Sequence, residues 1–241
     1  NDNLVSFLNI MKATQKNKVK GIMYASSSSV YGDENEIPFL EDSINLNPKS
    51  FYGLTKLMNE KMSLIFGKTG NLKMRGLRFF TVYGPWGRPD MAYFRLAASA
   101  LGEYSFDLFG DGSIKRDFTN IDDVIDISYE LFLDLIKKED TFNDVVNVGG
   151  GYPQSILQLV EEIRKFQEFN FDINIKESNT LDSKMTMASD IYLKSLIGNH
   201  NFKPLITGVR ELMTWAKEPE IRGSMGKWIS RSEEHTSELQ S

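Results

Sequence analysis

The residues best suited to chemistry are Tyr52 and Lys56, which lie four positions apart in the segment Phe51-Tyr-Gly-Leu-Thr-Lys56. On a helix this spacing puts both side chains on one face, about one turn apart. A phenol with the ordinary pKa of about 10 needs that pKa lowered before it can act as a base near neutral pH, and a neighbouring ammonium lowers it. The pair therefore predicts a tyrosine acid/base supported by a lysine.

A Tyr-x-x-x-Lys pair alone is weak evidence, because such a pair is expected by chance in a chain with this many tyrosines and lysines. The non-catalytic alternative is that the pair lies on a solvent-exposed helix face and that the serines form an ordinary turn. The context favours chemistry, because Ser26 to Ser29 directly follow residues 19–25, an apolar run typical of a buried strand. Ser27 lies 25 residues before Tyr52, and Val30-Tyr-Gly32 closes the loop. Ser27 is therefore the third candidate of the site.

The elements that must position these residues alternate between strand-like and helix-like patterns. Strands are predicted at 19–25, 74–80, 106–109 and 145–148, and helices in the opening segment and at 51–66, 91–101, 121–136, 155–166 and 207–217. The connections are too long for hairpins, which indicates an α/β fold with a parallel sheet covered on both faces. Ligands bind at the carboxyl ends of such strands, so the loops after Ala25, Phe80 and Val148 are expected to hold the site.

Composition and charge exclude several other classes of function. The chain has no cysteine, which excludes disulfides, thiolate nucleophiles and cysteine metal sites and agrees with a reducing, cytoplasmic location. Its two histidines, His200 and His235, give no basis for a histidine triad or a histidine-rich metal site, so no metal is predicted. The net charge of -5 offers no broad surface for nucleic acid. No apolar run approaches the roughly 18 residues of a membrane span.

The two ends of the chain differ from what lies between them. Residues 231–241 show no apolar periodicity and resemble the conceptual translation of a common sequencing adapter, so they are expected to be non-native. At the other end, Leu4, Phe7, Leu8 and Met11 already repeat at helical spacing. The chain is therefore expected to start inside a helix.

The strand, the serine loop ending in Val-Tyr-Gly and the Tyr-x-x-x-Lys pair together resemble the extended short-chain dehydrogenases, and the resemblance covers nearly all of residues 1–217. In that family the tyrosine is the acid/base. The lysine lowers the pKa of the phenol and holds the nicotinamide ribose, while a serine or threonine bonds the reacting sugar oxygen. The resemblance assigns these roles to Tyr52, Lys56 and Ser27 and implies NAD as cofactor. It also implies a Rossmann-type doubly wound parallel sheet with a smaller α+β substrate-binding lobe.

Two further segments sharpen the resemblance. Residues 76–91 are similar to the corresponding stretch of UDP-glucuronate 4-epimerases, where galactose epimerases usually carry Asn-Pro in place of Thr81-Val82. Residues 115–123 are similar to the family's Arg-Asp-Phe segment, whose arginine, here Arg116, pairs with the nucleotide diphosphate. The forked guanidinium suits two phosphate oxygens, and the bland alternative is a surface Arg-Asp pair.

The resemblance implies the remaining contacts and the division of the chain. Cofactor contacts are expected from Asn3, Phe80 and Val82 beside Tyr52 and Lys56, and substrate contacts from Ser27, Ser28, Thr81, Arg88, Phe109 and Arg116. Residues 1–84 and 117–149 are expected to bind NAD, and residues 85–116 and 150–230 the nucleotide sugar. A homodimer is expected for the full-length protein.

One departure from the family is large. Its Gly-x-x-Gly-x-x-Gly loop, which seats the cofactor diphosphate at a helix N-terminus, does not occur in this sequence. The sheet is therefore expected to be incomplete at the N-terminus, with roughly the first hundred residues of the family pattern absent. This chain by itself is expected not to turn over.

The reaction that the resemblance implies is 4-epimerisation of a UDP-sugar through a 4-keto intermediate, most closely UDP-glucuronate to UDP-galacturonate. Related dehydratases and decarboxylases carry an acidic residue just before Val-Tyr-Gly, where this chain has Ser28 and Ser29. These hydroxyls do not ionise at neutral pH, which disfavours elimination and loss of carbon dioxide. The alternatives are a 4-epimerase of neutral UDP-hexoses or UDP-N-acetylhexosamines, and a non-catalytic nucleotide-binding homologue.

Overall fold

The structure, a computed structural model, describes residues 2–33, 36–139, 141–177 and 184–238. Its principal sheet contains three parallel strands in the order β1 (Gly21–Ser27), β2 (Lys73–Phe79) and β6 (Asn143–Val148). In the register of this sheet Ser27 lies beside Phe79, and Phe79 beside Val148. The carboxyl ends of the three strands therefore meet at one edge, as predicted for the loops that follow them.

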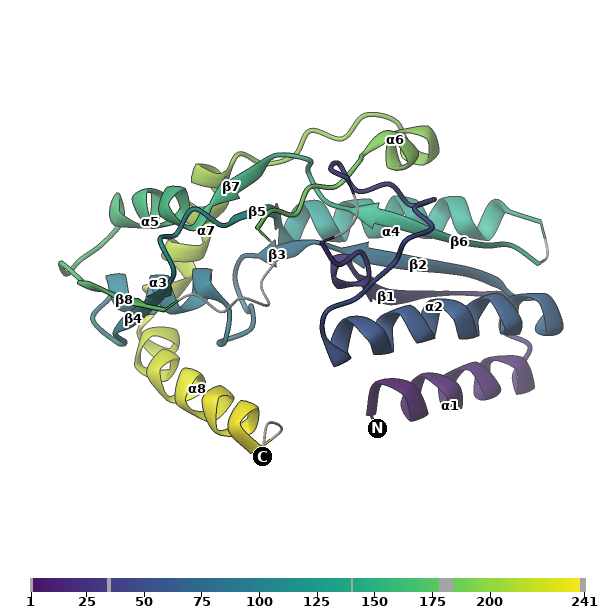
Figure 1. Cartoon of the computed structure of the whole chain (residues 1–241), viewed down its shortest axis with the longest axis horizontal. Helices are drawn as coiled ribbons and strands as arrows, with labels where there is room; N and C mark the ends of the chain where they lie inside the picture. Colours follow the sequence, from purple (N-terminus) through teal and green to yellow (C-terminus); the bar gives the residue numbers. More distant parts are fainter. Residues whose placement is uncertain (1, 34–35, 140, 178–183, 239–241) are drawn as a thin grey trace.

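Helices cover both faces of this sheet (Figure 1), which confirms the predicted Rossmann-type α/β fold. Helices α1 (Asp2–Lys16) and α2 (Phe51–Gly70) lie on one face, and α4 (Ile121–Lys137) and α6 (Ile191–Ile197) on the other. The α4 face is closed by buried aliphatic side chains from both layers, namely Leu77, Val124, Ile127, Leu131, Val146, Val148 and Leu193.

Local sequence explains where these helices begin and end. The side chain of Ser50 accepts a hydrogen bond from the backbone of Gly53 and caps α2, which ends at Asn71 in the left-handed conformation. Asn120 caps α4 in the same way, and Asp122 and Asp123 occupy its first turn, where the helix dipole favours acidic groups.

A second group of elements packs around its own core. It contains α3 (Ala92–Ala100), the parallel pair β4 (Phe106–Phe109) and β8 (Ile173–Lys176), and the helices α5 (Ile156–Arg164), α7 (Leu205–Ala216) and α8 (Pro219–Glu238). Figure 1 shows these elements gathered at the opposite end of the molecule from α1 and α2. Their largest common cluster of buried apolar residues includes Phe94, Leu101, Ile163 and Leu212.

Between the two groups lies a small mixed sheet that the apolar pattern did not predict. In it β3 (Thr81–Tyr83) pairs parallel with β5 (Lys115–Asn120), and β5 pairs antiparallel with β7 (Pro153–Ser155). Strand β5 is polar, so it lacks the alternation that marks a strand. Its buried Asp117 accepts backbone hydrogen bonds from Gly150, Gly151 and Ala188, which satisfies the carboxylate inside the protein.

The sequence prediction was incomplete in other places too. It ended the last helix near Lys217, whereas the structure adds α8, and it did not predict the short elements α6 and β8. Helix α6 has only seven residues and β8 only four, which is too short for a clear periodic pattern. The ten predicted elements are all present, with boundaries shifted by a few residues.

Candidate active site

The serine loop is held firmly at the end of β1. Ser27 is buried, and its hydroxyl accepts a hydrogen bond from the backbone N–H of Ser29 at 3.1 Å, which caps the short 3-10 helix Ser28–Val30. The same hydroxyl donates to the Ser29 Oγ at 3.1 Å. The side chains of Val30 and Tyr31 are fully buried. The predicted serine therefore sits on a fixed support at the ligand-binding edge of the sheet.

Tyr52 and Lys56 lie in the first two turns of α2, which packs directly onto the serine loop. A Cβ added at Gly53 would lie 2.6 Å from the carbonyl oxygen of Ser29, so only glycine permits this approach next to Tyr52. Lys56 Nζ donates to the carbonyl oxygen of Ala25 at 3.1 Å and lies 5.5 Å from the centre of the Tyr52 ring. The lysine thus joins the helix, the strand and the tyrosine, as their spacing predicted.

Partial burial also affects the pKa of Lys56. Removing the Lys56 ammonium from water lowers its pKa below the ordinary value. Tyr52 is 44% exposed, which leaves its phenol accessible to a ligand. The neighbouring Tyr31 is different: burial raises the pKa of Tyr31 to about 12, so it stays a neutral hydroxyl. The accessible Tyr52 is therefore the better candidate for proton transfer.

A buried polar network lies under the site, and the sequence did not reveal it. Glu60, one helical turn beyond Lys56, accepts hydrogen bonds from Ser26 Oγ at 2.5 Å and from Arg78 Nε and Nη2, each at 2.9 Å. Arg78 Nη1 also donates to the Tyr31 hydroxyl at 2.8 Å, and Tyr31 donates to Asn147 Oδ1 at 2.8 Å. The network ties α2, the serine loop, β2 and β6 together. The one local signal in the sequence is the four-residue spacing of Lys56 and Glu60, which puts Glu60 on the same face of α2.

A hollow of about 320 Å³ lies between α1, β1 and α2 and includes Asn3 and Lys56. Asn3 Nδ2 donates to Thr55 Oγ1 at 3.2 Å. Asn59, also on this hollow, is 3% exposed, and its Oδ1 has no partner among the described residues. The hollow is largely apolar, but the unpartnered acceptor of Asn59 and the Lys56 donors are polar groups that fit the hydroxyls of a dinucleotide ribose.

The other two predicted cofactor contacts have different surroundings. Phe80 is 6% exposed and packs with Val30, Tyr31 and Phe39, so its side chain belongs to the core. Val82 is partly buried against the cluster under α4. Their roles as cofactor contacts stay predictions.

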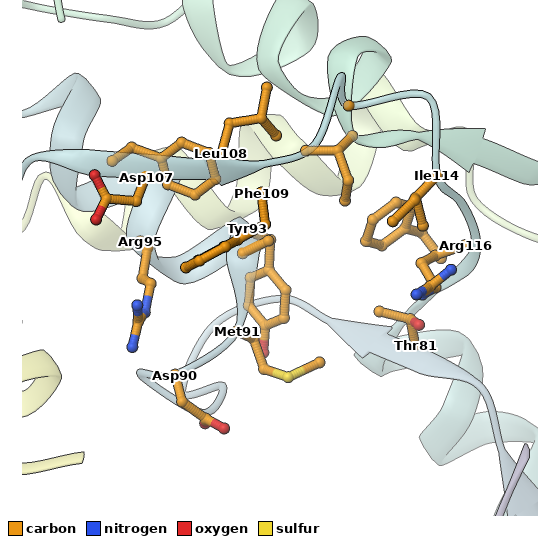
Figure 2. Close-up of a pocket in the computed structure, with 15 residues that line it drawn as sticks. Thr81, Asp90, Met91, Tyr93, Arg95, Asp107, Leu108, Phe109, Ile114 and Arg116 are labelled. Carbon is orange, nitrogen blue, oxygen red and sulfur yellow. The ribbon is translucent and has the colours of Figure 1, made fainter. Parts of the chain in front are cut away.

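A pocket of about 410 Å³ brings together three residues that were predicted from separate segments (Figure 2). Thr81 comes from β3, Phe109 from β4 and Arg116 from β5, and the pairing of β3 with β5 places Thr81 and Arg116 on adjacent strands. Figure 2 shows Thr81 and Arg116 at one end of the pocket and Arg95 and Asp107 at the other. The sequence did not single out Arg95 or Asp107.

Arg88 lies in the loop between β3 and α3, which is shaped by unusual backbone. Trp86 has a φ of 60°, and its ring packs against Trp215, with 5.3 Å between ring centres. A Cβ added at Gly87 would lie 1.8 Å from the Tyr93 hydroxyl oxygen. These contacts hold the loop against α3 and α7.

The guanidinium of Arg88 is paired with a carboxylate two residues away. Its Nε donates to Asp90 Oδ1 at 3.0 Å and its Nη2 to Asp90 Oδ2 at 2.5 Å. The bond to Asp90 raises the pKa of Arg88 above its ordinary value. Asp90 itself lines the pocket with Thr81 and Arg116. The bond to Asp90 therefore holds the Arg88 guanidinium next to a residue of this pocket.

Other kinds of site find no support among the described residues. No group of three or more His, Asp and Glu side chains in those residues is placed to hold a metal ion. None of the helices in the same part of the chain is long and apolar enough to cross a membrane.

Comparison with known proteins agrees with this geometry. Residues 1–149 match the model of the NAD dependent epimerase/dehydratase family. A probable UDP-glucuronate 4-epimerase of Rhizobium meliloti is 32% identical over 231 residues, which cover 88% of this chain and 67% of the relative. An uncharacterized 37.6 kDa protein of Escherichia coli is 35% identical over 233 residues, covering 90% of this chain and 69% of the relative.

Solved structures give the same result. The UDP-glucuronic acid 4-epimerase of Bacillus cereus, in complex with UDP-glucuronic acid and NAD, superposes with a TM-score of 0.81 at 30% identity, covering 90% of this chain and 67% of that one. The chain spans about two thirds of the length of these three relatives. The protein belongs to the NAD dependent epimerase/dehydratase family, and NAD is its cofactor.

Proposed function

We propose that the full-length protein is a UDP-sugar 4-epimerase that interconverts UDP-glucuronate and UDP-galacturonate. The observation that carries the proposal is the Arg88 guanidinium, which is held by Asp90, a residue of the pocket that Thr81 and Arg116 also line. Such a group suits a carboxylate on the sugar that undergoes reaction. The similarity to UDP-glucuronate 4-epimerases supports the same substrate.

The pocket supports the placing of a nucleotide diphosphate. Arg116 supplies a forked donor for two phosphate oxygens, and Phe109 an aromatic face at the side of the pocket, beside which the uracil would stack. A volume of about 410 Å³ is within the usual range for small-molecule sites. The sugar would then extend past Thr81 toward Ser27 and Tyr52.

In this arrangement Tyr52 takes the proton of the sugar C4 hydroxyl and later returns it to the same oxygen. Ser27 donates a hydrogen bond to that oxygen and orients it, and the Lys56 ammonium stabilises the phenolate. NAD, when bound, supplies a reversible hydride acceptor at C4. Because the proton and the hydride both return to the sugar, there is no net redox change, and C4 would be inverted if the 4-keto sugar turns over and receives the hydride on its other face. Lys56 and Asn3, which line the hollow between α1, β1 and α2, would hold the cofactor ribose.

The side chains around Ser27 also limit side reactions. Ser28 and Ser29 offer hydroxyls where elimination would need an acidic group. The 4-keto form of a uronate is a β-keto acid that readily loses carbon dioxide. A guanidinium that holds the carboxylate near the plane of the ring would disfavour the orbital alignment that this loss needs. Arg88 would thus both select the uronate and protect its intermediate.

The test is Arg88→Leu in the full-length enzyme, assayed with UDP-glucuronate and UDP-glucose side by side. Loss of a charged hydrogen bond should lower kcat/KM for the uronate, by an amount that corresponds to about 1.5 to 3 kcal/mol of transition-state stabilisation. The neutral sugar should be spared, and some UDP-pentose should appear. Arg210→Leu, on the exposed face of α7, is the matched control. Equal losses on both substrates would mean that Arg88 shapes the loop and does not read the carboxylate.

Two other functions make different predictions in the same assay. A 4-epimerase of neutral UDP-hexoses or UDP-N-acetylhexosamines would prefer those sugars before any substitution, and one solved relative at 25% identity is a UDP-N-acetylglucosamine 4-epimerase. A non-catalytic homologue would bind UDP-sugar and form no product. The contact of Lys56 with the Tyr52 ring and its bond to Ala25, two residues before Ser27, favour catalysis.

A further inference from the structure

We propose that Asp90 is a positioning residue that sets the enzyme's preference for acidic sugars by holding one edge of the Arg88 guanidinium and leaving the other edge for the substrate carboxylate. The inference rests on the proposed function, because it assumes that Arg88 reads a uronate. It adds a second residue, which does not itself touch the substrate, to the selection of that substrate.

The hydrogen-bond geometry carries the proposal. A guanidinium has donors on two edges, one formed by Nε and Nη2 and the other by Nη1 and Nη2. Asp90 accepts from Nε at 3.0 Å and from Nη2 at 2.5 Å, which is the first edge. The described residues provide no partner for Nη1, so the second edge keeps its donors. One planar group can therefore hold the internal carboxylate and a substrate carboxylate at the same time.

The surroundings make Asp90 a suitable anchor. The Arg88 side chain is 71% exposed, whereas that of Asp90 is 27% exposed and lines the pocket just before α3 begins. A long exposed arginine loses side-chain conformational entropy when it is fixed in one rotamer. Asp90 supplies part of this ordering before the substrate arrives, which lowers the entropic cost of binding the uronate.

The opposite charges of Asp90 and Arg88 also support a positioning role for Asp90. Asp90 already neutralises Arg88, so the loop does not attract every anion by net charge alone. Selection then depends on the direction of the free Nη1 and Nη2 donors, which only a carboxylate at the correct place can use in a two-pronged contact. An exposed pair of this kind contributes little to folding, so removing Asp90 should leave a folded enzyme.

The experiment compares Asp90→Asn and Asp90→Glu in the full-length enzyme with NAD, using UDP-glucuronate and UDP-glucose. Asp90→Asn should raise KM for the uronate roughly two- to fivefold, with a much smaller change in kcat and in the constants for UDP-glucose. Asp90→Glu, which keeps the carboxylate, should recover part of the loss. In an Arg88→Leu background, Asp90→Asn should add no further loss. Asp126→Asn, on the exposed side of α4, is the charge-matched control.

Four results would overturn the inference. A lower KM for the uronate would show that Asp90 competes with the substrate for Arg88. Equal losses on both sugars would show a purely structural role. An additive loss in the double variant would show that Asp90 acts independently of Arg88. If Arg88→Leu is selective against the uronate while Asp90→Asn is silent, only this inference fails; if Arg88→Leu is not selective, the proposed substrate fails first.

Discussion

The carboxylate of Glu60 and the guanidinium of Arg78 form a two-pronged ion pair beneath the serine loop, with both N···O distances 2.9 Å. The two side chains are 6% and 2% exposed. Ser26 donates to the same carboxylate, so the pair connects the helix that carries Tyr52 to the strand end that carries Ser27. A buried pair contributes little over an apolar pair of equal volume, but loss of one partner leaves the other charge uncompensated.

Glu60→Gln should therefore destabilise the protein by about 3 to 5 kcal/mol, since Arg78 would remain buried without its counter-charge. Urea unfolding of the full-length protein measures this. Glu162→Gln is the control, because Glu162 pairs with Lys165 at 2.7 Å on the surface of α5, where the loss should stay within about 0.5 kcal/mol. Similar losses of unfolding free energy in both variants would show that burial does not increase the contribution of the Glu60 pair to stability.

In the full-length enzyme, Tyr52→Phe should lower kcat by at least about two orders of magnitude, which is the usual effect of losing a general base. Substrate affinity should stay close to that of the wild type. Steady-state kinetics gives kcat, and calorimetric titration with UDP-glucuronate gives affinity. Tyr129→Phe removes a hydroxyl that is exposed on α4 and should change neither quantity. An active Tyr52→Phe enzyme would mean that another group is the base.

Gly87→Ala should weaken turnover of the uronate, because the new Cβ would lie 1.8 Å from the Tyr93 hydroxyl oxygen and force the Arg88 loop to move. Gly223→Ala is the matched control, since a Cβ at Gly223 in α8 meets nothing within 4 Å. That control should be neutral, or stabilising by up to about 1 kcal/mol through helix propensity. Kinetics on UDP-glucuronate and thermal unfolding of both variants separate the two effects. Unchanged uronate kinetics in Gly87→Ala would show that the loop adapts without moving Arg88.

Glu41→Gln should change how stability depends on pH. Burial raises the pKa of the Glu41 carboxyl above its ordinary value of 4.5, so the folded state keeps a proton that the unfolded state releases just above that pH. Stability of the wild type from this group is therefore full at lower pH and falls as pH rises through the raised pKa. The glutamine cannot titrate, and its oxygen can still accept from the Asn147 backbone N–H, a bond of 2.9 Å in the wild type.

The measurement is the midpoint of thermal unfolding between pH 4 and 7. The midpoint of Glu41→Gln should rise steadily relative to that of the wild type as pH rises. The midpoint of Glu130→Gln, on the exposed side of α4, should follow that of the wild type. A difference, variant midpoint minus wild-type midpoint, that stays constant or falls with rising pH would contradict the assigned cause.

The sequence alone was sufficient for the parts of the site that depend on local geometry. Helical spacing places Tyr52 and Lys56 on one face, and a serine loop after an apolar strand places Ser27 at its carboxyl end. Alternation of apolar strands with helices also predicted the parallel sheet, because each strand needs helical cover on both faces. These features repeat over a few residues, so they are visible without knowledge of distant contacts.

Only the tertiary structure decided which distant groups meet. Glu60 meets Arg78 because α2 packs on β2, and Thr81 and Arg116 line one pocket because β3 pairs with β5, neither of which any local pattern records. The polar strand β5 exists because buried Asp117 collects backbone donors from two other segments, so burial and hydrogen bonding replace the missing apolar alternation. The edge of Arg88 that Asp90 covers depends on a loop shaped by Trp86 and Tyr93, whose packing partners lie beyond the loop itself. The chemistry was readable in the residue types, and its arrangement was set by the packing free energy of the whole fold.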